Sequence, residues 1–267
     1  MPTLEEIKSR QQATWASGNY GKVAWATVPL ADLLVEAVQL RPGAKVLDIA
    51  TGTGHVALAA ARRFCDATGI DYVPALLEVA RRRAAAEGLE VDFVEGDAEN
   101  LPCPDGQFDY ALSTIGAMFA PNQERAASEM LRVTRPGGTI GMINWTPEGL
   151  VGELFKTVAR YAPPPSELKP ATMWGSEERV NELLGPGASD LSFTHGKITM
   201  GFLSPEHYAD FFLTWFGPTH KAAEPLDPDS RDAFRADIVD VASRFNRATD
   251  GTAAIEAGYL VAVATKR

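Results

Sequence analysis

Short apolar runs alternate along the chain with longer stretches in which apolar residues recur at helical spacing. Val46, Leu47 and Ile49 form one such run, too apolar for a half-exposed strand, and predict a buried parallel strand. An alanine-rich segment at 55–63 follows and predicts a helix. We expect further strands at 64–71, 91–95, 108–114 and 139–144, with helices at 75–87 and 123–133 between them. This order predicts an α/β fold with a doubly wound, mostly parallel sheet.

The residues before and after this α/β region show other patterns of apolar and polar positions. We expect residues 1–40 to form a helical entry segment, broken by Gly18 and Gly21 and ending in an amphipathic helix with Leu33 on its apolar face. Residues 146–253 predict helices at 151–161, 177–184, from 204 onward and at 230–246, with strand character at 191–202. Residues 254–267 supply a last strand, centred on 259–265.

One predicted helix carries an aromatic stripe. Its members recur at spacings of three and four residues: Tyr208, Phe211, Phe212, Trp215 and Phe216. Such a stripe is more often the core of a protein than a binding surface. The other interpretation is a lid whose apolar face covers a substrate. We interpret 146–253 as a substrate-covering cap added to the sheet domain at 41–145, not as an independent domain.

Composition narrows the classes of partner. The chain has 267 residues, of which 45 % are hydrophobic, enough for one large core or a core with a small cap. Its 35 acidic and 25 basic residues give a net charge of −10 without a dense basic run, which argues against nucleic acid or an anionic membrane as the main partner. We find no signal-peptide pattern and no apolar run of membrane-spanning length, and expect a cytoplasmic protein without membrane insertion.

Cysteine and histidine usage points away from metal chemistry. Cys65 and Cys103 fit no disulfide or metal framework, and the four histidines are scattered. Three of them, His195, His207 and His220, lie in the 146–253 region and are candidates for a general base. A lone histidine there is more often a surface or satisfied residue, so we assign no catalytic residue and no metal ligand.

The turn after the first strand is the first chemical signal. Thr51-Gly52-Thr53-Gly54 lets a ligand approach the backbone closely, and the helix that follows offers free N–H groups. The segment also fits the dinucleotide fingerprint GxGxx(G/A), a weak signal by itself. Asp48 lies before the glycines, which is unusual for a hydride-transfer enzyme and suits a ligand's ammonium group.

A second acid lies at the end of the second predicted strand. Asp71 is placed to accept hydrogen bonds from two vicinal ribose hydroxyls, because a carboxylate offers two oxygens. The alternative is a helix N-cap close to Pro74, which predicts no ligand.

These residues together resemble a known family. The run from Asp48 through Ala50, Gly52 and Gly54 is similar to the first motif, (D/E)-x-G-x-G-x-G, of class I S-adenosylmethionine (SAM)-dependent methyltransferases. Ala50 replaces the first glycine. Gly96-Asp-Ala-Glu-Asn-Leu-Pro102 resembles the family's adenine-recognition loop, and 130–138 resembles its usual approach to the fifth strand. The resemblance covers about residues 40–145 and is strongest to the small-molecule and quinone-biosynthesis branch.

The resemblance implies a seven-stranded Rossmann-like sheet that binds SAM at the carboxyl ends of its first strands and releases S-adenosylhomocysteine. Asp97 would accept from the adenine amino group, the Ala98 N–H would donate to a ring nitrogen, and Tyr72 would lie against the adenine. Tyr20 belongs to a segment that folds over the cofactor in related enzymes, although packing on the first helix explains it equally well. The implied cofactor residues are Tyr20, Asp48, Ala50, Thr51, Gly52, Gly54, Asp71, Tyr72, Asp97, Ala98 and Thr114.

The candidate acceptor site is apolar. Met118 and Phe119 follow the fourth strand, Trp145 follows the fifth, and Trp215 belongs to the stripe, so we expect a small, largely hydrophobic or aromatic acceptor methylated on O, N or C. Two alternatives remain, a nicotinamide-dependent oxidoreductase, which leaves Asp48 and the 96–102 loop without a role, and a non-catalytic SAM-binding protein. The sequence leaves a homodimer open.

Overall fold

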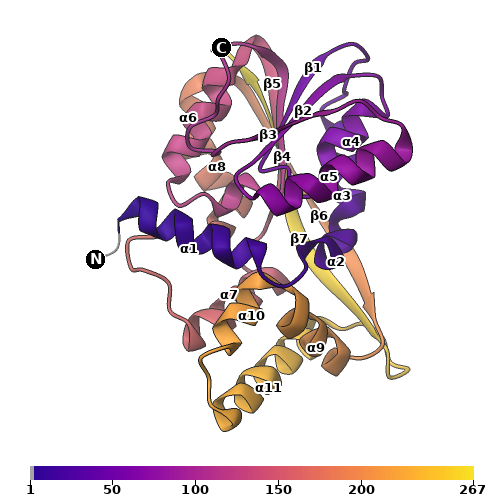
Figure 1. Ribbon diagram of the computed structural model, residues 1–267, viewed down its shortest axis with the longest axis vertical. Helices are drawn as coiled ribbons and strands as arrows, with labels where there is room; N and C mark the ends of the chain where they lie inside the picture. Colours follow the sequence, from indigo (N-terminus) through magenta and orange to yellow (C-terminus); the bar gives the residue numbers. More distant parts are fainter. Residues whose placement is uncertain (1–2) are drawn as a thin grey trace. The chain divides into compact units, whose positions relative to one another are not determined.

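The computed structural model describes residues 3–267, and its contacts divide the chain into two compact units (Figure 1). We call Thr27–Asn144, Lys169–His195 and Leu260–Arg267 the sheet unit. We call Met1–Ala26, Trp145–Leu168 and Gly196–Tyr259 the helical unit, of which residues 1 and 2, part of the expected 1–40 segment, lie outside the described residues.

The predicted fold class is confirmed. Among residues 3–267, seven strands form one sheet in the order β3-β2-β1-β4-β5-β7-β6, in which β1 to β5 are parallel and β7 is antiparallel. The strands are β1 (Lys45–Ile49), β2 (Asp66–Asp71), β3 (Asp92–Glu95), β4 (Phe108–Thr114), β5 (Thr134–Trp145), β6 (Ala188–Phe202) and β7 (Ala253–Lys266). The strand order reverses between β1 and β4, and this switch point is where open α/β sheets bind ligands.

Helices cover both faces of the sheet unit. α3 (Val28–Ala37), α4 (His55–Ala61) and α5 (Pro74–Glu87) pack on one face, and α6 (Gln123–Val133) and α8 (Glu177–Leu184) on the other (Figure 1). We call these the α4 face and the α6 face. Gly141 faces the α4 side, because a Cβ there would lie 2.5 Å from Val38 Cγ1 of the segment after α3. Its neighbours in β5 therefore face α6.

Short 3₁₀ helices lie between the longer elements. They are η1 (Trp25–Thr27), η2 (Ala117–Phe119), η3 (Ala171–Gly175) and η4 (Gly185–Gly187). η2 follows β4 and packs against both α6 and η3. The Arg179 side chain in α8 is buried and donates from Nε to Gln123 Oε1 of α6 at 3.0 Å, and Gln123 Nε2 donates to Pro170 O at 3.1 Å. This chain of bonds fixes residues 169–184 to the α6 face.

The helical unit packs around aromatic side chains. Its helices are α1 (Leu4–Ala16), α2 (Tyr20–Ala24), α7 (Leu150–Tyr161), α9 (Pro205–Trp215), α10 (Gly217–Ala223) and α11 (Pro228–Phe245). Tyr208 of α9 is fully buried and stacks on Phe212 with ring centroids 4.3 Å apart. Phe216 is also buried, whereas Phe211 and Trp215 are half-buried. Most of the stripe is therefore core, and its two half-buried members are the ones available to a ligand.

Several local predictions were wrong. Leu33 was predicted to lie on the apolar face of its helix, but its side chain is 45 % exposed. The buried face of α3 is formed instead by residues that include Leu30, Leu34 and Val35, and Leu33 points away from it. Gly21 lies inside α2 and does not break it. The break falls at Gly18, where φ is +66° and a Cβ would lie 2.6 Å from the Trp215 carbonyl oxygen. The fifth strand begins at Thr134 instead of residue 139.

Within residues 3–267, every helix is too short or too polar to span a membrane. Within the same range, no group of three or more histidine, cysteine, aspartate or glutamate side chains is arranged to hold a metal ion, and both cysteines are free.

The close packing of α3 on β5 gives a stability test. Gly141→Ala should lower the free energy of unfolding by about 1–3 kcal/mol, because its methyl group would overlap Val38 and Leu112. Gly201→Ala in β6 is the matched control, since its Cβ would meet nothing within 4 Å. Urea unfolding followed by circular dichroism measures both, and equal stability of the two variants would contradict the packing argument.

Candidate active site

The loop after β1 adopts a tight left-handed course. Ala50, Gly52 and Gly54 have φ angles of 54°, 53° and 88°. Ala50 therefore occupies a conformation that favours glycine, at a cost of roughly 1–2 kcal/mol for an L-residue. Gly116, after β4, packs on this loop so closely that a Cβ there would lie 2.5 Å from the Ala50 carbonyl oxygen. The ends of β1 and β4 are thus locked together at the switch point.

Asp48 fastens the loop to the helix that follows it. The carboxylate is 2 % exposed, and its Oδ2 accepts from Thr51 Oγ1 at 2.5 Å and from the Ala57 N–H at 3.0 Å. Burial raises the pKa of this carboxyl to about 7, with the two hydrogen bonds acting in the opposite direction. The residue therefore supports the turn directly, and any contact with a ligand's ammonium group stays a prediction.

Asp71 connects three loops. Its Oδ2 accepts from the Gly52 N–H at 2.8 Å, its Oδ1 accepts from the Val73 N–H at 2.9 Å, and its backbone carbonyl accepts from the Gly96 N–H at 3.0 Å. Burial raises the pKa of the Asp71 carboxyl to about 6. Each carboxylate oxygen keeps lone-pair capacity for another donor. The N-cap alternative is wrong, since Val73 is the N-cap of α5 and no side chain caps that helix.

The loop after β3 is held by its own side chains. Asp97 Oδ1 accepts from the Glu99 N–H at 2.9 Å, as a turn residue does. Glu99 is buried, and its Oε1 accepts from the Asn122 N–H at 2.6 Å, which ties the loop to the start of α6. The loop is rigidly placed beside Asp71, and the adenine contacts of Asp97 and Ala98 remain predictions.

The end of β4 presents two hydroxyls to opposite faces. Ser113 Oγ donates to Ile49 O at 2.8 Å and accepts from the Ala117 N–H at 2.9 Å, so it anchors η2 on the α6 face. Thr114 points to the α4 face, and its buried Oγ1 has no hydrogen-bond partner. A buried hydroxyl without a partner at the switch point is what a ligand-facing position would leave in a protein without its ligand.

The predicted site residues fall into both units. The sheet unit brings together those at the carboxyl ends of β1 to β4: Asp48, Ala50, Thr51, Gly52, Gly54, Asp71, Tyr72, Asp97, Ala98, Thr114, Met118 and Phe119. Tyr20, Trp145 and Trp215 belong to the helical unit. Within that unit Tyr20 packs edge-on against Trp15 with centroids 5.5 Å apart, and Lys22 Nζ lies 3.9 Å from the centroid of Trp215.

Comparison with known proteins gives the family. Residues 46–138 match the methyltransferase domain family. An uncharacterized protein of Mycobacterium tuberculosis is 37 % identical over 98 % of this chain and 96 % of its own length. The chain belongs to the class I SAM-dependent methyltransferases. The methyltransferase is also 40 % identical to the demethylmenaquinone methyltransferase of Thermus thermophilus, over 42 % of this chain and 53 % of that protein.

A solved structure agrees on the fold. The crystal structure of a putative methyltransferase from Bacillus halodurans superposes with a TM-score of 0.60 at 23 % identity, covering 88 % of this chain and 98 % of that one. The two proteins thus share the Rossmann-like sheet, and family membership makes this protein an enzyme. Its family membership removes the nicotinamide-dependent oxidoreductase as an alternative.

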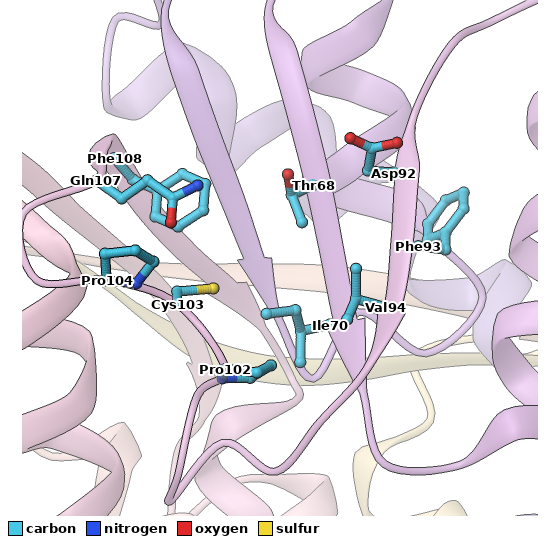
Figure 2. Close-up of a pocket in the computed structure, with 10 residues that line it drawn as sticks. All are labelled: Thr68, Ile70, Asp92, Phe93, Val94, Pro102, Cys103, Pro104, Gln107 and Phe108. Atoms are coloured by element: carbon cyan, nitrogen blue, oxygen red, sulfur yellow. The ribbon is translucent and has the colours of Figure 1, made fainter.

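A groove on the methyltransferase lies apart from this site. It has a volume of about 340 Å³ and is lined by Thr68, Ile70, Asp92, Phe93, Val94, Pro102, Cys103, Pro104, Gln107 and Phe108 (Figure 2). Thr68 and Ile70 alternate along β2 with Gly69 and Asp71, so they point to the opposite face of the sheet from the Asp71 carboxylate. The groove is therefore not the cofactor site.

Two buried polar groups are not among the site residues predicted from the sequence. Asn144 in β5 is 2 % exposed and Trp174 in η3 is fully buried, and neither Asn144 Nδ2 nor Trp174 Nε1 has a partner. An asparagine ending an apolar strand was a usable signal for the first. No local pattern marks Trp174, because its burial depends on the packing of η3 against η2.

The raised pKa of Asp48 predicts a pH dependence. The folded pKa of about 7 lies above the ordinary value of 3.8, so ionisation opposes folding at pH 8 and this penalty disappears as pH falls. Asp48→Asn has no such group. Wild type should therefore gain on the order of 1–2 kcal/mol of unfolding free energy relative to Asp48→Asn between pH 8 and about pH 5.5. Urea titrations at both pH values measure this, and a constant difference would exclude the effect.

Proposed function

We propose that the methyltransferase transfers the methyl group of SAM to a small, largely hydrophobic or aromatic acceptor. The observation that carries the cofactor part is the Asp71 network, which holds the loops after β1, β2 and β3 in fixed positions at the switch point. The Asp71 carboxylate would accept the two ribose hydroxyls through its remaining lone pairs. Family membership supports SAM as the cofactor, and S-adenosylhomocysteine is the product that this reaction leaves.

The other cofactor roles follow from the same arrangement. Asp97 and the Ala98 N–H would recognise the adenine edge, and Tyr72 would pack on its ring. The glycine loop would hold the methionine part, with the Thr114 hydroxyl as a further contact from β4. The proposed set is Tyr20, Asp48, Ala50, Thr51, Gly52, Gly54, Asp71, Tyr72, Asp97, Ala98 and Thr114.

The acceptor class rests on apolar side chains. Met118 and Phe119 lie in η2, directly after the strand that ends at Thr114. Trp145 and Trp215, which belong to the helical unit, are further predicted contacts, and all four side chains are apolar or aromatic and carry no charge. The similarity to a demethylmenaquinone methyltransferase supports an acceptor with a substantial apolar part. That residues 146–253 cover the acceptor, that the chain forms a homodimer and that it works in the cytoplasm stay predictions.

The protein's contribution to catalysis would be positioning. SAM supplies a methyl group on a sulfonium, and the side chains would hold the acceptor atom in line with it while excluding water, which is worth about 7–11 kcal/mol in well-oriented reactions. No side chain is assigned as a base. The candidate histidines have other contacts: His195 Nε2 lies 2.9 Å from Glu177 Oε1, and His220 Nδ1 lies 3.1 Å from Leu213 O.

Calorimetry tests the proposal directly. SAM and S-adenosylhomocysteine should bind the purified protein, whereas NAD and NADP should not. Radiolabelled SAM with a panel of small aromatic acceptors should then give labelled product. Binding without transfer to any acceptor would favour the non-catalytic alternative, and absence of SAM binding would refute the proposal.

Removing the Asp71 carboxylate should weaken SAM binding. Asp71→Ala should reduce affinity roughly tenfold to a hundredfold, because the ribose hydroxyls lose a buried acceptor. Asp71→Asn keeps the shape but turns one acceptor oxygen into a donor, so it should weaken the ribose contact and lose one of the two loop contacts. Asp66→Ala, an exposed acid at the other end of β2, is the control and should bind SAM as wild type does. Unchanged affinity in folded Asp71 variants would place SAM elsewhere.

Substitution of the half-buried Trp215 tests the proposed acceptor site. Trp215→Ala should reduce methyl transfer at least about tenfold while SAM affinity stays within a few-fold, since an aromatic contact is worth about 0.5–1.5 kcal/mol beyond its buried area. Phe212→Ala removes a buried ring of the same helix and should instead lose about 3–5 kcal/mol of stability. Thermal melts beside a SAM titration compare them. A melting temperature for Trp215→Ala as low as that of Phe212→Ala would make Trp215 a core residue.

A further inference from the structure

Two buried side-chain nitrogens of the sheet unit have no hydrogen-bond acceptor. They are the side-chain amide nitrogen of Asn144, which is 2 % exposed, and the indole nitrogen of Trp174, whose side chain is fully buried. An unpaired buried donor is rare in native proteins, because it forfeits its hydrogen bonds to water without replacing them. Two in the same layer of one unit therefore require an explanation.

Both donors belong to the α6 face. Met142 pairs with Ser113 in the parallel register of β4 and β5, so these two side chains share a face, and Asn144 lies two residues further along β5 on the same side. Ser113 accepts from the Ala117 N–H of η2 on that face. η3, which carries Trp174, packs against η2. Asn144 thus lies near the carboxyl end of β5, at the edge where α/β proteins bind their ligands, and η2 links the segment of Trp174 to the same face.

The chemistry of the two groups defines their partner. An amide NH₂ and an indole N–H can only donate, so the missing group is an oxygen or another acceptor with free lone pairs. Cations on the same layer already have anionic partners: Arg125 pairs with Glu129, Arg132 with Glu129 and Asp105, and Arg179 with Glu124 and Glu182. A carboxylate partner would therefore be buried beside carboxylates whose cationic partners are already engaged. A neutral carbonyl oxygen fits this environment.

We infer that Asn144, with Trp174 as a second donor, binds a carbonyl oxygen of the methyl acceptor. This inference rests on the proposed function and narrows its substrate class to small apolar molecules that carry a carbonyl group. Met118 in η2, which is 1 % exposed, adds a buried apolar side chain beside η3. Specificity then comes from the donors, since a molecule without the oxygen leaves both of them unpaired.

A matched pair of probes isolates the carbonyl oxygen. α-Tetralone and tetralin share a bicyclic hydrocarbon frame and differ in one carbonyl group. Protein loaded with S-adenosylhomocysteine should bind α-tetralone at least about tenfold more tightly than tetralin, in fluorescence or calorimetric titrations. Equal binding of the two probes, or no binding of α-tetralone, would overturn the inference.

Variants of Asn144 and Trp174 test whether these two donors cause the preference for α-tetralone over tetralin. Asn144→Leu should abolish the preference for α-tetralone and leave tetralin binding within twofold. It should not lower the melting temperature, because the amide nitrogen has no intramolecular partner to lose. Trp174→Phe keeps an aromatic ring, removes the N–H and should reduce the preference, and it decides the question if Asn144→Leu does not fold. A preference that survives in folded Asn144→Leu would overturn the assignment.

Thr134→Val is the control from the other end of β5. Thr134 is fully buried, and its Oγ1 donates to Met130 O at 2.7 Å. This variant should melt at a lower temperature and keep the α-tetralone preference, the reverse of Asn144→Leu.

A separate titration with SAM distinguishes failure of the proposed function from failure of this inference. Loss of SAM binding in wild type would refute the proposed function, whereas SAM binding without a carbonyl preference would refute only this inference.

Discussion

The hydrogen bonds of one residue, Asp71, hold the active-site edge of this methyltransferase together. Its side chain accepts N–H groups from the loop after β1 and from its own loop, and its carbonyl accepts the Gly96 N–H after β3. Three loops that are far apart in the sequence are thereby fixed against one residue. Each contact replaces a bond to water that burial removes, so the loops cannot separate without leaving a polar group unpaired. Rigid loops are what a catalyst that works by positioning requires.

Burying these carboxylates has an electrostatic consequence. Asp48 and Asp71 have raised pKa values because burial penalises their charged forms, in spite of the N–H groups directed at them. The protein without ligand therefore holds acids whose ionisation opposes folding near neutral pH. A ligand that brings a cation and hydroxyl donors to this edge would remove part of that penalty. Stability and ligand binding are then linked through the same two side chains.

Buried polar groups without a hydrogen-bond partner lie on both faces of the sheet at this edge. Thr114 Oγ1 faces the α4 side, and Asn144 Nδ2 faces the α6 side, at the ends of neighbouring strands. Each lowers the stability of the isolated protein, because a buried polar group without a partner is unfavourable. Such sites are common where function competes with stability. Their distribution on the two faces agrees with a cofactor on one side and an acceptor on the other.

The sequence by itself determined the fold class, the strands and helices around Asp48 and Asp71, and the family. These features depend on local patterns: an apolar run, a glycine turn, and acids at strand ends. The tertiary structure alone decided that Asp71 fastens three loops, that Leu33 is exposed, and that Tyr208 belongs to the core instead of a lid. It also revealed Asn144 and Trp174, because a missing hydrogen-bond partner is a property of packing between distant segments. No spacing within one segment encodes it.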